Sequence, residues 1–250
     1  MNIAISEPKR LYQEIGFSLQ ERILKGEFSV GDRLPPERDI AEEMKVSRSV
    51  VREAIIMLEL QGLVEVRKGS GIYVINNIPS KDSLNGQTSM PRSSSDIGPF
   101  ELLQARQVIE SEISGFAARH ITKSDIQRLR DVLNIEKNNL ESGIEDYDSD
   151  ELFHFIIAEA SQNSVLADIA SDLWQRRHES SMWRQLHSRI TDNNYRKAWL
   201  SDHEKVLVAL QKRDSEGARK AMWEHLENVK QVLFKLSDVD DPKFDGYLFP

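Results

Sequence analysis

The first apolar stripe in the chain steps by four residues. It consists of Leu11, Ile15, Leu19 and Ile23, which is the spacing of the buried face of one helix. Two further short helices are predicted over residues 37–44 and 48–60. The prolines at 35 and 36 suit the start of the former, because a missing N–H has no partner in a first turn. Ser47 precedes the latter as its N-cap.

After the third helix the helical spacing gives way to two short apolar runs. Residues 63–67 and 72–75 are separated by a Gly-rich segment at 68–71, a pattern typical of a β-hairpin. The tip of this hairpin carries Arg67 and Lys68. A helix–turn–helix unit followed by a basic hairpin is the geometry of a winged DNA reader.

From about residue 98 onward the apolar spacing is helical again. Leu102, Ile109, Ile113 and Phe116 mark one helix, and Thr122 or Ser124 begins the next. Further helices are predicted at about 146–161, 164–187, 192–212 and 214–236. The predicted fold is therefore mainly α: an N-terminal winged helix-turn-helix plus a C-terminal antiparallel all-helical bundle.

A polar stretch rich in Ser, Asn, Pro and Gly separates these two patterns, and it is too polar to bury. We therefore expect a DNA-binding domain over 1–76, a flexible linker over 77–97, a helical domain over 98–236 and a C-terminal tail over 237–250.

Charge and composition limit the classes of function that the chain can have. The net charge is −8, but residues 1–76 carry 11 Lys and Arg against 12 Asp and Glu, so the acidity lies mostly in the second part. A local basic patch in the first part is enough to bind phosphates. The absence of cysteine excludes disulfides and thiol catalysis. There is no apolar run of about 20 residues and no secretory signal, which favours a cytoplasmic protein without a membrane partner.

Candidate DNA-reading side chains lie near the start of the third helix. Val51, Ala54, Ile55 and Leu58 form its apolar face. Arg48, Ser49 and Arg52 point toward the other face, and an arginine fork suits guanine O6 and N7. The alternative is a plain packing motif, because helix–turn–helix units also occur without DNA.

Four residues have the composition of a metal site. Asp150 and His154 are four residues apart on one predicted helix, and His203 and His225 lie on the last two helices. In an antiparallel pair these last two come level. Three imidazoles and one carboxylate suit Zn, Ni, Mn or Fe, and imidazole favours the first two. Core or hydrogen-bonded histidines are the alternative.

Two further residues have both a plain and a functional interpretation. Arg106 either pairs with Glu110 at i,i+4 or anchors an anionic ligand, since a guanidinium matches carboxylate geometry. Asn163 either caps a helix or contacts a ligand in the bundle.

The motifs of the first domain resemble a known family. L-P-P-E-R-D-I-A at 34–41, V-S-R-S-V-V-R-E-A at 46–54 and R-K-G-S-G-I-Y-V at 67–74 are similar to the winged helix-turn-helix of GntR-family bacterial regulators. The resemblance implies that operator DNA is contacted by Arg38, Ser47, Arg48, Ser49, Arg52, Lys68 and Gly69.

The helical domain resembles the metal-binding subset of the FadR-like effector domain, known as FCD, within that family. This implies a divalent metal, Zn with Ni or Mn as alternatives, beside a small carboxylate effector held by Arg106 and Asn163. The implied metal ligands are Asp150, His154, His203 and His225.

Segments at 98–107, 221–231 and 245–249 are similar to the repressors of hexuronate utilisation in the same family. The resemblance implies a homodimeric transcriptional repressor of glucuronate, fructuronate or galacturonate genes that a sugar acid releases from DNA. Two alternatives stay open at this point: a metal-dependent enzyme acting on sugar acids, and an architectural DNA protein with an inert bundle.

Overall fold

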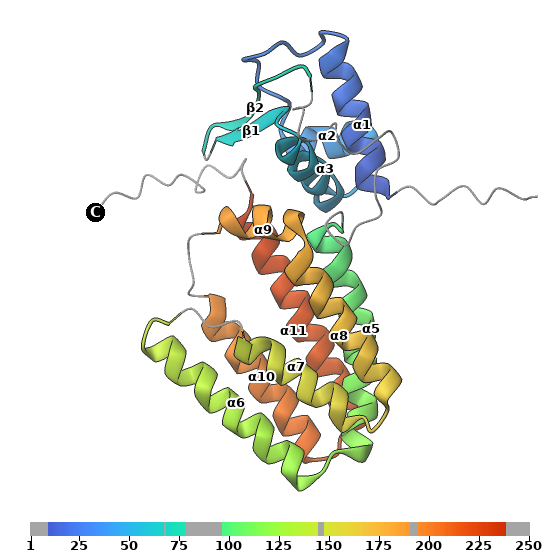
Figure 1. Cartoon of the computed structure of the whole chain (residues 1–250), viewed down its shortest axis with the longest axis vertical. Helices are drawn as coiled ribbons and strands as arrows, with labels where there is room; N and C mark the ends of the chain where they lie inside the picture. Colours follow the sequence, from blue (N-terminus) through green and yellow to red (C-terminus); the bar gives the residue numbers. More distant parts are fainter. Residues whose placement is uncertain (1–9, 68, 79–96, 145–147, 191–194, 239–250) are drawn as a thin grey trace, which may run out of the picture. The chain divides into compact units, whose positions relative to one another are not determined.

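The computed structural model describes residues 10–67, 69–78, 97–144, 148–190 and 195–238 (Figure 1). The chain folds as two compact units. The first holds the described residues up to Phe100 together with Ser181–Arg189 and residues 237–238. The second consists of Glu101–Ser180 and Ile190–Leu236.

The first unit is a winged helix-turn-helix. Its helices are α1 (Leu11–Leu24), α2 (Glu37–Met44) and α3 (Arg48–Leu60), and its wing is the antiparallel pair β1 (Val64–Arg67) and β2 (Gly71–Val74). The short helix α9 (Ser181–Ser188) belongs to the same unit and packs on α3.

The core of the first unit lies between α1 and α3. Ile15, Leu19 and Ile23 of α1 are buried, as are Val51, Ala54, Ile55 and Leu58 of α3. Leu11, which begins the predicted stripe of α1, is 49% exposed and does not belong to the core. The wing is fixed by backbone hydrogen bonds from the segment before α2, in which Leu34 N–H donates to the Ile72 carbonyl at 2.8 Å.

The second unit is a helical bundle (Figure 1). It contains α5 (Pro99–His120) from Glu101 onward, together with α6 (Lys123–Glu141), α7 (Asp148–Ala160), α8 (Ser164–Glu179), α10 (Tyr195–Gln211) and α11 (Ser215–Leu236). α10 packs against both α11 and α6, and α6 packs against α7. The predicted fold class, mainly α with a winged N-terminal part, is confirmed.

Local signals explain several helix starts. The Thr122 hydroxyl accepts a hydrogen bond from Asp125 N–H, and the Asp125 carboxylate accepts one from Thr122 N–H, so α6 begins with a capping box. The Asp214 carboxylate accepts a hydrogen bond from Gly217 N–H at 2.9 Å, as expected for the cap of α11.

One predicted helix was wrong. The stretch 164–187 is not continuous, because Ser180 has extended backbone (φ −67°, ψ 117°) and separates α8 from α9. Met182, Trp183 and Leu186 of α9 are buried in the first unit, so tertiary packing ends α8 where the apolar spacing alone continues it. Most of the predicted linker (79–96) and tail (239–250) lies outside the described residues. None of the described helices has the length and hydropathy of a membrane span.

Candidate metal centre and nucleic-acid interface

The turn between α2 and α3 places the start of α3 at the surface. Lys45 adopts the left-handed conformation (φ 56°) and ends α2. The Ser47 hydroxyl then accepts a hydrogen bond from Val50 N–H at 3.4 Å and caps α3. Ser47 is exposed, whereas Arg48 and Ser49 are partly exposed. The first turn of α3 is therefore accessible, as the predicted reading of a DNA groove requires.

Two other predicted DNA contacts also lie at the surface. The Arg38 side chain is 75% exposed and donates to the Asp39 carboxylate at 3.1 Å. Gly69 at the wing tip is exposed and has a φ of 67°, a conformation that glycine adopts without strain. Lys68 lies outside the described residues.

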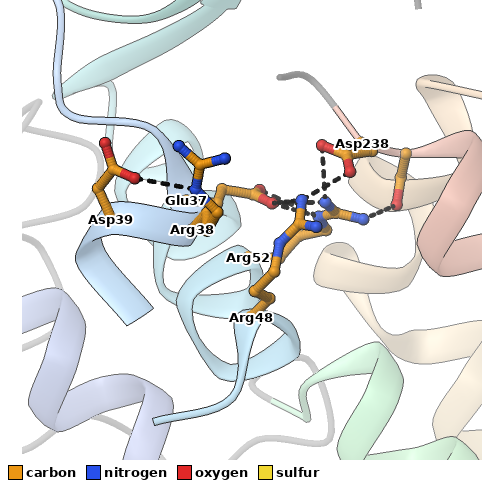
Figure 2. A network of polar contacts seen from close by, with 7 residues as sticks. Glu37, Arg38, Asp39, Arg48, Arg52 and Asp238 are labelled. Atoms are coloured by element: carbon orange, nitrogen blue, oxygen red, sulfur yellow. Dashed lines mark hydrogen bonds and ion pairs between the residues drawn. The ribbon is translucent and has the colours of Figure 1, made fainter. Parts of the chain in front are cut away.

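Arg52 differs from its predicted exposed position. Its side chain is fully buried, and its Nε donates to both carboxylate oxygens of Glu37 at 3.0 Å (Figure 2). Glu37 is also fully buried, in the first turn of α2. The face of α3 opposite the apolar stripe is thus buried near Arg52. The helical spacing could not predict this, because the residues that bury Arg52 come from other segments of the chain.

The cover includes two residues that follow α11 in sequence and belong to the first unit. Ser237 Oγ accepts a hydrogen bond from Arg52 Nη1 at 2.9 Å, and the Asp238 carboxylate lies 2.6 Å from Arg48 Nη2. Figure 2 shows the two guanidinium groups between Glu37 and Asp238. The Arg48 guanidinium, which is the group that would contact a phosphate or a guanine, is therefore already paired with the Asp238 carboxylate.

Replacing Asp238 with asparagine is expected to increase operator affinity by up to about five-fold, because partly exposed ion pairs are worth about 0.2–1 kcal/mol. Arg48 then reaches DNA without first leaving a carboxylate. The measurement is fluorescence anisotropy of labelled operator at fixed salt. Glu42→Gln is the matched control, since it removes the same charge from an exposed position on α2. Equal affinities of the Asp238→Asn variant, the control and the unaltered protein would contradict the expectation.

The second unit brings the four predicted metal ligands together. Asp150 and His154 lie on α7, His203 on α10 and His225 on α11. One ligand atom from each residue lies within 4.8 Å of all the others. His203 Nε2 is 3.2 Å from His225 Nε2 and 3.5 Å from Asp150 Oδ1.

The chemistry of this cluster fits a divalent cation. The three imidazoles are buried, and His154 Nε2 makes no hydrogen bond among the described residues. A buried polar atom without a partner is costly unless something else binds it. Three histidine nitrogens and one carboxylate oxygen are a donor set typical of zinc, nickel and related metals.

The surroundings of the cluster favour the metal-binding forms of two of its ligands, Asp150 and His225. Burial raises the pKa of the Asp150 carboxyl, but the positive charges of His154, His203 and nearby arginines outweigh it, so the net effect is a lowered pKa. Burial and the charges of His203 and His154 hold the pKa of His225 well below its usual value. An ionised carboxylate and a neutral imidazole are the metal-binding forms.

Arg106 lies beside this cluster and is buried. Its Nε donates to Glu110 at 2.7 Å, and its guanidinium lies 4.0 Å from the centroid of the Trp174 ring. Burial raises the pKa of Glu110, yet Arg106 and His154 together lower it to about 2. The i,i+4 pair is thus present, and it does not exclude an anion-binding role for Arg106.

Asn163 does not belong to this buried group. It is exposed, and its side-chain oxygen accepts hydrogen bonds from the N–H groups of Val165 and Leu166, as an N-cap of α8. An effector contact by Asn163 stays a prediction.

Sequence reasoning missed three carboxylates that face the histidines. Glu136 Oε2 is 3.2 Å from His203 Nδ1, and Glu110 Oε2 is 2.5 Å from His154 Nδ1. Asp202 Oδ2 is 4.0 Å from His225 Nδ1. A signal for Glu136 existed, because it continues the buried stripe of α6 formed by Leu129, Val132 and Leu133.

Comparison with known proteins identifies the family. Residues 11–74 match "Bacterial regulatory proteins, gntR family", and residues 101–228 match "FCD domain". The chain belongs to the gntR family. As a gntR-family protein with an FCD domain, it is a DNA-binding transcriptional regulator that binds operator DNA, and it is not an enzyme. The enzyme alternative is therefore set aside.

Relatives within the gntR family cover nearly the whole chain. The "Uxu operon regulator" of Haemophilus influenzae is 52% identical over 96% of this chain and 88% of its own length. The "Uxu operon transcriptional regulator" of Escherichia coli K12 is 49% identical over 96% of this chain and 93% of its own length. The "Exu regulon transcriptional regulator" of the same organism is 47% identical over 98% of this chain and 93% of its own.

Proposed function

We propose that this gntR-family regulator represses genes of hexuronate utilisation and leaves its operator when a sugar acid binds in the helical unit. The observation that carries the proposal is the 47–52% identity, over 96–98% of the chain, to regulators named for the uxu operon and the exu regulon. The proposal places the protein in the cytoplasm, where its operator DNA lies.

The proposed cofactor is a divalent metal, Zn with Ni or Mn as alternatives, held by Asp150, His154, His203 and His225. The convergence of these four side chains supports it. When bound, such an ion supplies open coordination positions for a carboxylate or hydroxyl group. Arg106 then adds a guanidinium for the effector's carboxylate, and Asn163 is a second proposed contact.

The proposed domain division follows the sequence: DNA reading by 1–76, a linker over 77–97, effector binding and dimerisation by 98–236, and a tail over 237–250. The proposed DNA contacts are Arg38, Ser47, Arg48, Ser49, Lys68 and Gly69. The resemblance also implies Arg52, but its side chain is fully buried against Glu37, and we propose that it holds Glu37 in place. A homodimer is proposed because one recognition helix reads only a few base pairs, whereas two related by a two-fold axis read a palindrome.

The test is operator release by sugar acids. We expect metal-loaded protein to bind DNA from its own upstream region at nanomolar concentration, and one of fructuronate, glucuronate and galacturonate to abolish that binding. Fluorescence anisotropy at fixed salt measures both. Arg106→Lys, which keeps a positive charge beside the buried Glu110, is expected to keep operator affinity and to need about ten-fold more acid for release, because the anion loses a bidentate guanidinium partner. Tight binding that none of the three acids changes would contradict the hexuronate assignment.

A further inference from the structure

The ring nitrogens of the three clustered histidines have different surroundings on their two sides. The Nε2 atoms converge with Asp150: His203 Nε2 lies 3.2 Å from His225 Nε2, and His154 Nε2 lies 3.6 Å from Asp150 Oδ1. Each Nδ1 atom points away from that centre and faces a carboxylate.

The three carboxylates come from different positions in the bundle. Glu110 on α5 faces His154 Nδ1 at 2.5 Å, and Glu136 on α6 faces His203 Nδ1 at 3.2 Å. Asp202 on α10 lies 4.0 Å from His225 Nδ1, which is an ion-pair separation and too long for a hydrogen bond, so Asp202 acts on this ring through its charge. All three are buried.

From this pairing we infer that Glu110, Glu136 and Asp202 are positioning residues of the metal centre; the inference rests on the metal site proposed above. A carboxylate that accepts a hydrogen bond from Nδ1–H fixes the imidazole tautomer and the ring orientation. The Nε2 lone pair is then directed at the shared centre. The carboxylate also makes the imidazole a stronger donor toward a cation.

Glu136 makes the strongest case against a merely structural role. Glu136 is 3% exposed, and among the described residues it forms its hydrogen bond and ion pair with His203. Burying a carboxylate against one imidazole costs more free energy than an apolar side chain at the same position of the α6 stripe. Packing of the bundle does not require a carboxylate at position 136, whereas orienting the His203 ring does.

Glu110 and Asp202 connect the centre to further side chains. Glu110 is shared between His154 and Arg106, so it joins the proposed effector anchor to a metal ligand. Asp202 also accepts hydrogen bonds from Lys205 at 2.7 Å and from Asn228, one helical turn beyond His225 on α11, at 2.8 Å. The positioning carboxylates thus tie metal binding to the packing of α5, α6 and α10.

The test compares metal binding by full-length Glu136→Gln and Asp202→Asn variants with that of the unaltered protein. Glutamine and asparagine keep the size of each side chain and remove its charge. We expect each variant to lose about 10–100-fold in affinity for Zn²⁺, measured by competition with a chromophoric chelator. The visible spectrum of the Co²⁺-loaded protein is expected to change as well, because it reports ligand orientation.

Asp131→Asn is the matched control, since it removes a carboxylate from an exposed position of α6. We expect its Zn²⁺ affinity and Co²⁺ spectrum to equal those of the unaltered protein. Thermal unfolding of the metal-free proteins checks that each variant folds. If one of the two variants does not fold, the other still tests the positioning role. Folded variants with unaltered affinity and spectrum overturn the positioning role. An unaltered protein that binds neither ion overturns the metal site itself, which is a distinct result.

Discussion

Replacing Arg52 with alanine is expected to destabilise the first unit by about 3–5 kcal/mol, because it leaves a buried carboxylate without its partner. Arg52 and Glu37 are both fully buried and form three hydrogen bonds with each other. Arg48 lies 3.9 Å from Glu37, but it is partly exposed and already paired with Asp238. The remaining guanidinium therefore cannot replace the lost one.

The measurement is thermal and chemical unfolding of the full chain, followed by circular dichroism. Arg38→Ala is the control, because that arginine is exposed, and its change is expected to stay within about 0.5 kcal/mol. The double replacement Arg52→Met with Glu37→Leu is expected to recover much of the loss, since two apolar side chains leave no buried charge. An Arg52→Ala variant with unaltered unfolding and weakened operator binding would instead make Arg52 chiefly a DNA contact.

This expectation changes how loss of DNA binding is interpreted. Arg48→Ala removes a partly exposed side chain, so its expected cost of about 1–3 kcal/mol falls on operator binding. Arg52→Ala lowers the folded fraction of the same unit first. The two arginines are one helical turn apart on α3, yet burial separates their roles.

Local chemistry explains why the first unit could be predicted closely from the sequence. The bounds of α2 and α3 agree with the prediction because they depend on neighbouring residues: prolines before Glu37, left-handed Lys45 and the Ser47 cap. The hairpin depends on the glycines at its tip. The break at Ser180 and the burial of Arg52 depend on contacts with distant segments, which spacing along one helix does not contain.

In the candidate metal centre, too, the features set by spacing along a helix could be predicted, and those set by contacts between distant segments could not. Asp150 and His154 share a face of α7 by spacing alone, and His203 meets His225 because α10 and α11 pack together, as a bundle predicts. Glu110 and Glu136 reach the histidines from α5 and α6. Their part in the site follows from bundle geometry, which no short motif records.

Replacing His203 with alanine is expected to abolish stoichiometric metal binding. His203 Nε2 lies 3.2 Å from His225 Nε2 on α11 and 3.5 Å from Asp150 Oδ1 on α7. Its loss therefore removes the metal ligand that lies near those of both other helices. It also leaves Glu136 buried without its imidazole. The loss in affinity is therefore expected to exceed the roughly 10–100-fold typical of outer-shell residues.

Metal content and metal-dependent stability both measure this effect. A ligand that binds only the folded state stabilises it by about 2.7 kcal/mol at 100 times its Kd. Added Zn²⁺ should therefore raise the Tm of the unaltered protein and of the control His120→Ala, whose imidazole is exposed and lies at a tilt against the Phe116 ring. The Tm of His203→Ala should not respond. Operator affinity without effector is expected to persist in His203→Ala, because the proposed DNA-reading side chains belong to the other unit. Retention of one equivalent of metal by this variant would show that the ligand set is wrong.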